Sequence, residues 1–136
     1  MSHTIVLNRE LGVIVLRARE RMEFPEFANI FAEILALPGF EPGLPLVADF
    51  RQGQTQVSTA EIRQLAAHAH AMDGRWGTAK WAILTSNDLT YALARMFGTL
   101  TSDCQVATQV FRDLKSASAW LGLSVGIAEI LERTPH

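Results

Sequence analysis

Short apolar runs alternate with longer segments of helical periodicity, and this alternation constrains the fold more than any other feature of the sequence. Residues 4–8 and 12–19 are rich in β-branched residues and predict a hairpin joined at residues 9–11. After a first helical segment, three more apolar runs follow, each with its own helical segment: residues 46–49, 79–85 and 105–111. Strands separated by helices favour a mostly parallel sheet with right-handed crossovers.

The predicted fold class is therefore α/β, with a single mixed, mostly parallel five-stranded sheet and about four flanking helices, in the order ββαβαβαβα. The hairpin supplies the antiparallel pair. Residues 105–111 alternate polar and apolar side chains, which is typical of an edge strand. Residues 13–16 are apolar on both faces, so that strand should be covered on both sides, and Arg17 and Arg19 should mark where one face meets water.

Capping residues mark the predicted helix boundaries. Pro25 suits a first helical turn, and Ser58 with Glu61 forms a capping-box pattern. The candidate N-caps of the third helix are Ser86, Asn87 and Asp88. The fourth helix should begin after Asp113 and end at Gly122. After Gly122 the chain should add a last helical turn or two. Trp76 lies in a loop and should either tuck beneath it or join a contact surface.

Composition predicts one globular domain over residues 1–136 in the cytoplasm. Twelve Lys and Arg against 14 Asp and Glu give a net charge of −2, which argues against nonspecific nucleic-acid binding. The single cysteine, Cys104, excludes an internal disulfide and is typical of a reducing compartment. No apolar run approaches the ~20 residues of a membrane helix, and no signal peptide is visible.

The order of elements resembles the STAS superfamily, the anti-sigma-factor-antagonist fold, and within it the SpoIIAA-like branch of small bacterial proteins. The residues on which this resemblance rests are 46–50 (LVADF), 81–97 (WAILTSNDLTYALARMF), 110–113 (VFRD) and 117–121 (ASAWL). It covers residues 4–121 and leaves 122–136 as a C-terminal extension. The branch is similar in shape to the lipid-carrying CRAL-TRIO domains.

The resemblance implies a non-enzymatic regulatory or protein-interaction module, expected to form a homodimer. In the antagonists of this superfamily, a serine at the start of the helix after the central strand is phosphorylated. Ser58 lies near that place, but residues 57–60 read Val-Ser-Thr-Ala where the family has Asp-Ser-Ser-Gly. Ser58 is thus a candidate phosphorylation site, with a plain helix cap as the simpler interpretation.

The histidines and the cysteine show no pattern of a catalytic or metal site. His68 and His70 are two residues apart on one helix and point in different directions, so they are not a metal pair. His3 is near the chain terminus and is expected to be mobile. No zinc spacing, phosphate-binding glycine loop or nucleophile elbow occurs. We predict no catalytic residues, no metal and no cofactor.

Polar side chains follow the strands at residues 46–49 and 79–85, where open α/β sheets usually bind ligands. The candidates for a polar rim are Asp49, Arg51, Thr55, Ser86, Asn87, Asp88, Tyr91 and Arg95. This rim could hold an anion or a partner loop through backbone amides and Arg95. The simpler interpretation is ordinary helix capping beside an exposed stack of Tyr91 and Arg95.

Three functions follow from these observations. The first is a regulatory or interaction module with an unknown protein partner. The second is a carrier or sensor of a small lipophilic or anionic ligand, because short apolar helices over a sheet can leave a cavity. The third is an enzyme with a site at the strand exits, which the absence of catalytic spacing disfavours.

Overall fold

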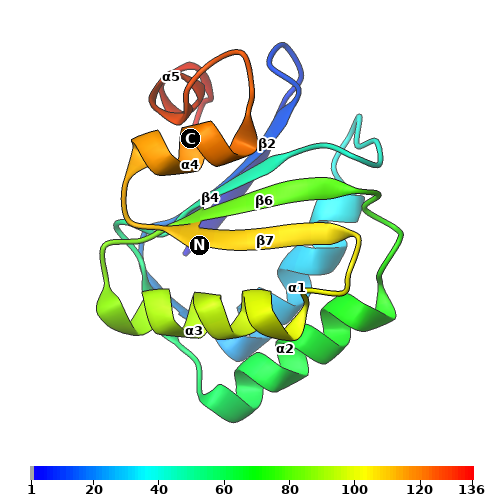
Figure 1. Cartoon of the computed structure of the whole chain (residues 1–136), viewed down its shortest axis with the longest axis vertical. Coiled ribbons are helices and arrows are strands. Elements are labelled where there is room, and N and C mark those ends of the chain that lie inside the picture. Colours follow the sequence, from blue (N-terminus) through cyan, green and yellow to red (C-terminus); the bar gives the residue numbers. More distant parts are fainter. Residues whose placement is uncertain (1) are drawn as a thin grey trace.

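The computed structural model describes residues 2–136 and has the predicted class of fold (Figure 1). The main sheet has the strand order β1-β2-β4-β6-β7, with β1 and β2 antiparallel and the other neighbours parallel. Its strands are β1 (His3–Asn8), β2 (Val13–Ala18), β4 (Leu46–Asp49), β6 (Ala79–Leu84) and β7 (Val106–Phe111). The predicted mixed sheet and the predicted edge position of β7 are both confirmed.

The described chain has five helices, where the sequence predicted about four. They are α1 (Phe24–Leu35), α2 (Thr59–Ala71), α3 (Asp88–Leu100), α4 (Leu114–Leu121) and α5 (Ile127–Arg133). A second, two-stranded parallel sheet joins β3 (Arg21–Glu23) to β5 (Gln54–Gln56), and the sequence did not predict it. These three-residue strands are too short to show a periodic pattern.

Sheet order and chain order coincide, which places each helix in a definite layer. From β2 onward every parallel strand is added on the same side of the one before it. Right-handed crossovers therefore put the intervening helices on one face. Figure 1 shows α1, α2 and α3 together on one side of the sheet, and α4 with α5 on the other.

Side-chain alternation along the strands divides the core into two clusters. On β2, Ile14 and Leu16 face α1–α3, whereas Val13 and Val15 face α4 and α5. The prediction that this strand is covered on both sides is confirmed. The second cluster is completed by the C-terminal helix, since Ile127 and Ile130 are fully buried against it. Helix α5 has seven residues, about the two turns that the sequence suggested, and its buried side chains belong to the core.

The predicted caps are largely observed. Ser58 and Glu61 form the reciprocal capping box of α2, and Pro25 lies in the first turn of α1. The Asp113 side chain accepts a hydrogen bond from the Ser116 amide at the start of α4. None of the described helices combines the length and apolar character that a membrane crossing requires.

The loops that precede β4 and β6 are in direct contact, and Trp76 is buried beside them. Gly77 has φ +76°, and a Cβ there would lie 2.6 Å from the Gly43 nitrogen. The Gly43 amide donates to the Trp76 carbonyl at 2.7 Å. Trp76 thus tucks inward, with its ring 5.6 Å from Phe31 and 5.2 Å from Trp81 between centroids.

Arg17 corrects one expectation from the sequence: it does not mark where a sheet face meets water. Its side chain points to the same face as Val13 and Val15, and only 7% of the residue is exposed. The guanidinium donates to the carbonyls of Thr134 (3.1 Å), Pro135 (3.2 Å) and Leu131. These carbonyls are at the end of α5, where helix geometry leaves acceptors without intrahelical partners. Arg17 therefore anchors the C-terminal segment, while Arg19 is exposed as predicted.

We expect Arg17→Ala to lower the free energy of unfolding by about 2–4 kcal/mol, because it leaves buried carbonyls without donors. Urea unfolding followed by circular dichroism measures this change. Arg19→Ala is the matched control and should stay within about 0.5 kcal/mol of the wild type. Equal effects of the two substitutions would show that the contacts with the C-terminus contribute nothing.

His3 corrects a second expectation from the sequence, which suggested a mobile residue near the terminus. Its side chain is buried beside α1. Its Nδ1 contacts Glu26, and its Nε2 is 2.9 Å from Glu33 Oε2, two turns along the same helix face. Burial lowers the pKa of His3, but hydrogen bonds and charge from Glu33 and Glu26 outweigh burial and raise the pKa above 6.5. These contacts join β1 to α1 and favour the charged form of the imidazole.

A histidine whose pKa is raised by folding contributes stability that is fully present below its unfolded pKa of about 6.5 and is lost as pH rises through the folded value. We expect His3→Gln to be destabilised relative to the wild type at pH 5.5, with the difference shrinking above about pH 6.5. Urea unfolding from pH 5.5 to 8.5 tests this. The exposed His68→Gln should follow the wild type, and a pH-independent loss in His3→Gln would exclude the charged form.

Candidate functional site

The exits of β4 and β6 meet in a cluster of polar contacts. The Arg51 guanidinium forms a two-point ion pair with Asp49, with Nε–Oδ1 and Nη2–Oδ2 both at 2.9 Å. The Ser86 hydroxyl, at the exit of β6, donates to the Arg51 carbonyl at 3.2 Å. Asp49, Arg51 and Ser86 of the predicted rim are therefore in contact. The charges of Asp49 and Arg51 neutralise each other.

The exit of β7 adds a residue that the sequence analysis did not include. Arg112 follows this strand and donates to Asp88 Oδ1 at 2.6 Å. Its guanidinium carbon lies 4.3 Å from the centre of the Tyr91 ring, a cation–π geometry. Arg112, rather than Arg95, therefore covers Tyr91. No pattern in the sequence could identify Arg112, because its partners are on the neighbouring helix.

Arg95 is exposed on α3, more than one turn beyond Tyr91. The guanidinium groups of Arg51 and Arg112 both face carboxylates. The first turn of α3 is also occupied, since Asn87 Oδ1 accepts from the Thr90 amide at 3.0 Å. These contacts stabilise the rim without a ligand, and they leave little uncompensated positive charge to attract an anion.

Thr55 is separated from the other rim residues and faces the interior. Its hydroxyl oxygen lies 3.0 Å from that of Thr90, which joins β5 to the first turn of α3. Asp49 belongs to the opposite face of the sheet, because it alternates with Ala48, whose side chain faces α1–α3. The predicted rim is thus divided, with Thr55 on the helix-covered side.

A cavity of about 110 Å³ lies on this side, between the sheet and helices α1, α2 and α3. It is partly open to the surface, and its lining is almost wholly apolar. The sheet contributes Leu16, Leu46, Ala48, Trp81, Ile83 and Thr108, and the helices contribute Phe27, Ile30, Phe31, Ile34, Ile62, Leu65, Thr90, Leu93, Ala94 and Phe97. Phe50, Thr55 and Val57 complete the wall.

The chemistry of the lining favours an apolar occupant. The hydroxyl groups of Thr55 and Thr90 are bonded to each other, so they offer little to a polar guest. The lining includes no charged side chain. Apolar cavities of this kind exclude water and accept small apolar molecules, as an engineered cavity of about 150 Å³ accepts benzene.

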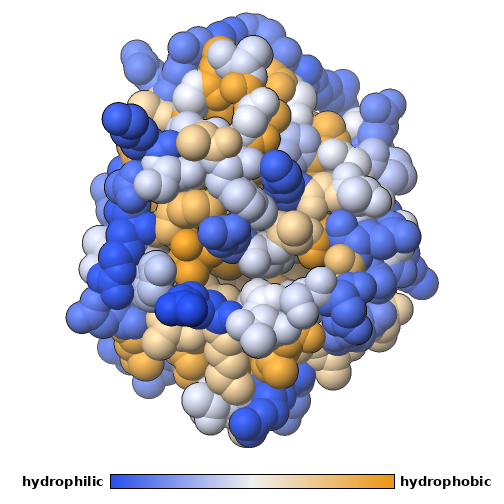
Figure 2. Space-filling model, viewed as in Figure 1, coloured by the Kyte–Doolittle hydropathy of each residue, from blue (hydrophilic) through white to orange (hydrophobic). Residues whose placement is uncertain are grey.

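Few large apolar side chains are exposed on the outer surface of the described residues. Leu89 (60% exposed) and Leu100 (36%) are the large apolar side chains exposed among residues 2–136. On the face drawn in Figure 2, hydrophobic surface occurs in small areas separated by hydrophilic residues. An apolar patch of a few hundred Å², which would indicate a partner surface, is not evident on that face.

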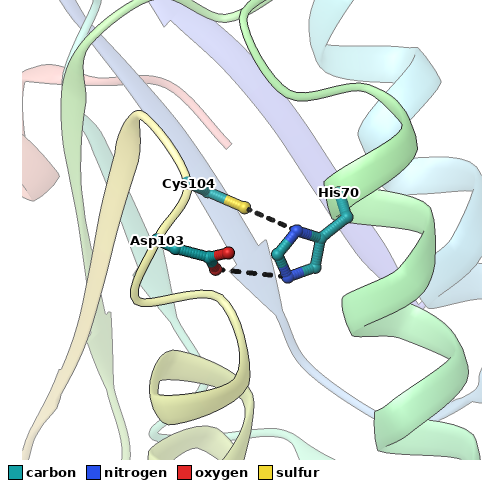
Figure 3. A group of neighbouring side chains, drawn as sticks. All are labelled: His70, Asp103 and Cys104. Atoms are coloured by element: carbon teal, nitrogen blue, oxygen red, sulfur yellow. Dashed lines mark hydrogen bonds and ion pairs between the residues drawn. The ribbon is translucent and has the colours of Figure 1, made fainter.

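A second cluster of chemically active groups lies at the other end of α2, away from the strand exits. His70, Asp103 and Cys104 converge there (Figure 3), with Cys104 Sγ 3.6 Å from His70 Nδ1. Burial, with the charges of Asp73 and Asp103, raises the pKa of Cys104, so the thiol is protonated at neutral pH. The sequence analysis missed this contact because 34 residues separate His70 from Cys104.

A mixed sheet whose strands follow the chain order, with three crossover helices on one face, is the arrangement of a SpoIIAA-like α/β fold. A solved structure supports this assignment: an uncharacterised protein of the DUF3478 family from Shewanella loihica PV-4, described as having a SpoIIAA-like fold. It matches with a TM-score of 0.54 over 88% of this chain and 91% of its own, at 15% sequence identity. No protein-family model and no curated protein matches the sequence. The fold predicted from the resemblance is confirmed, and an identity this low shows the fold alone.

The structure selects one of the three predicted caps of α3, and we expect stability to follow that choice. Asn87→Ala should cost about 1 kcal/mol of unfolding free energy, because the Thr90 amide loses its acceptor. Ser86→Ala, which removes only an exposed hydrogen bond, should change the stability by less than about 0.5 kcal/mol. Thermal unfolding of both variants measures the difference, and a larger loss in Ser86→Ala would contradict the assignment.

Proposed function

We propose that this protein is a non-enzymatic binding module whose ligand is a small apolar molecule, or the apolar end of a larger one, held between the sheet and α1–α3. The observation that supports this function best is the cavity of about 110 Å³ with its apolar lining. It corresponds to the second of the three functions that the sequence suggested. The polar rim enters the proposal only through Thr55, which lines the cavity.

The size of the cavity limits the ligand. It is somewhat smaller than the space of about 150 Å³ that accepts benzene, so a small ring or a short alkyl chain is the appropriate size. An unfilled cavity costs about 24 cal/mol per Å³ of volume, or about 2–3 kcal/mol here. A ligand that fills it recovers contacts of that order, and longer ligands can extend through the open side.

The proposed binding module has no enzymatic role. A catalytic site would need an acid, base or nucleophile at the cavity, and the lining consists of apolar side chains and threonines. A regulatory role could follow if the ligand changed the position of α3, which contributes Thr90, Leu93, Ala94 and Phe97 to the wall. The expected homodimer, the protein partner and phosphorylation of exposed Ser58 stay predictions.

Benzene is the first probe. At about ten times its dissociation constant it should stabilise the protein by about 1.4 kcal/mol, which raises Tm by about 4–6 °C for a domain of this size. Differential scanning fluorimetry measures this shift. Phenol at the same concentration should raise Tm less, because its hydroxyl would be buried without a partner.

The variant that tests the location is Ala94→Phe, which places a ring in the cavity. It should retain the fold and lose at least about 10-fold in benzene affinity. Ala92→Phe, on the exposed side of the same helix, is the matched control and should bind as the wild type does. Equal benzene shifts in the two variants, or no shift in the wild type, would exclude the cavity as the binding site.

A further inference from the structure

We propose that His70, Asp103 and Cys104 form a binding site for a divalent transition-metal ion of the zinc class. His70 lies in the last turn of α2, while Asp103 and Cys104 belong to the loop between α3 and β7 (Figure 3). One donor atom from each residue lies within 4.8 Å of the other two. The inference is independent of the proposed apolar ligand.

The orientation of the imidazole suits a metal ligand. His70 Nε2 lies 3.0 Å from the Leu100 carbonyl oxygen, which can only accept a hydrogen bond. Nε2 therefore holds the proton, and the lone pair of Nδ1 points toward Cys104 Sγ. Histidines that bind metals usually donate their other ring N–H to a carbonyl or carboxylate in this way.

The distance between the two strongest donors also fits. Tetrahedral zinc, with bonds of about 2.3 Å to sulfur and about 2.0–2.1 Å to nitrogen, places those two ligand atoms about 3.6 Å apart. The observed separation of Sγ and Nδ1 is 3.6 Å. Asp103 Oδ1 lies 3.4 Å from Nε2, so this exposed side chain must turn toward Nδ1 and Sγ to supply the third bond.

The loop that presents Asp103 and Cys104 is held at both sides. The Cys104 amide donates to the Thr101 carbonyl at 3.0 Å, and the next amide, of Gln105, donates to Asp73 Oδ1 at 2.9 Å. Ligands on a constrained loop lose less entropy when they bind an ion. Because zinc binds the thiolate, coordination would release the proton of Cys104 to solvent.

The alternative interpretation is a hydrogen bond from the Cys104 thiol to Nδ1 with no ion, which the same distance allows. Spectroscopic titration with Co²⁺ distinguishes the two. The full-length protein, stripped with chelator and kept reduced, should bind one equivalent of Co²⁺ and develop a sulfur-to-cobalt charge-transfer band. Zn²⁺ should then remove the band by displacement.

Variants locate the site. Cys104→Ser should abolish the charge-transfer band, and His70→Gln should weaken binding by more than about 100-fold, since losing even an outer-shell partner costs about 10–100-fold. His68→Gln is the matched control on the same helix, where the ring lies 6.3 Å from Phe24, and it should bind as the wild type does. Binding without the band, unchanged affinity in His70→Gln, or no binding at all would overturn the proposal.

A second measurement does not depend on any variant. In the wild type, Zn²⁺ should slow alkylation of Cys104 by iodoacetamide at least 10-fold, because a coordinated thiolate is shielded from the reagent. An unchanged alkylation rate at saturating Zn²⁺ would also overturn the proposal. Both readouts are separate from the benzene titration, so the two proposals can fail independently.

Discussion

The order of the strands in the sheet is also their order along the chain, and this constraint determines which layer each helix joins. Right-handed crossovers put α1, α2 and α3 on one face, and no crossover remains to cover the other. Only the segment after β7 can cover it, and α4 and α5 do so through Ile127, Ile130 and their neighbours. A charged side chain, Arg17, stabilises that closure by bonding the last carbonyls of α5. Arg17, which the sequence suggested would meet water, is thus a structural anchor.

The same constraint explains why the cavity lies where it does. Three helices cover one sheet face, and aromatic residues of α1 and α3 line the space between these helices and the sheet. Phe31 stacks on Phe97 at 6.1 Å between ring centroids, and its other neighbour is Trp76. On the sheet side, Ala48 leaves room below these rings. Large aromatic side chains and a small residue, Ala48, line the space that we assign to a ligand.

The sequence predicted those features that depend on neighbouring residues. Alternation identified the strands of the main sheet, and short capping patterns such as Ser58 with Glu61 located helix starts. Features formed by distant residues were not predictable in this way. Arg17 contacts residues 114–118 positions away, and His70 meets Cys104 across 34 residues. The polar rim illustrates both cases, because Asp49 and Arg51 pair locally, while Tyr91 on α3 is covered by Arg112, which follows β7.

The contact between Arg17 and the C-terminal segment also affects how the molecule folds. The entropy lost on closing a loop grows with the logarithm of its length. The Thr55–Thr90 hydrogen bond spans 35 residues, whereas that between Arg17 and Thr134 spans 117, which adds about 1 kcal/mol to its closure. The contact between Arg17 and Thr134 therefore costs more entropy to form from the unfolded chain than the contact between Thr55 and Thr90. A contact between residues so far apart in the sequence slows folding, because its closure entropy is lost before the contact can contribute.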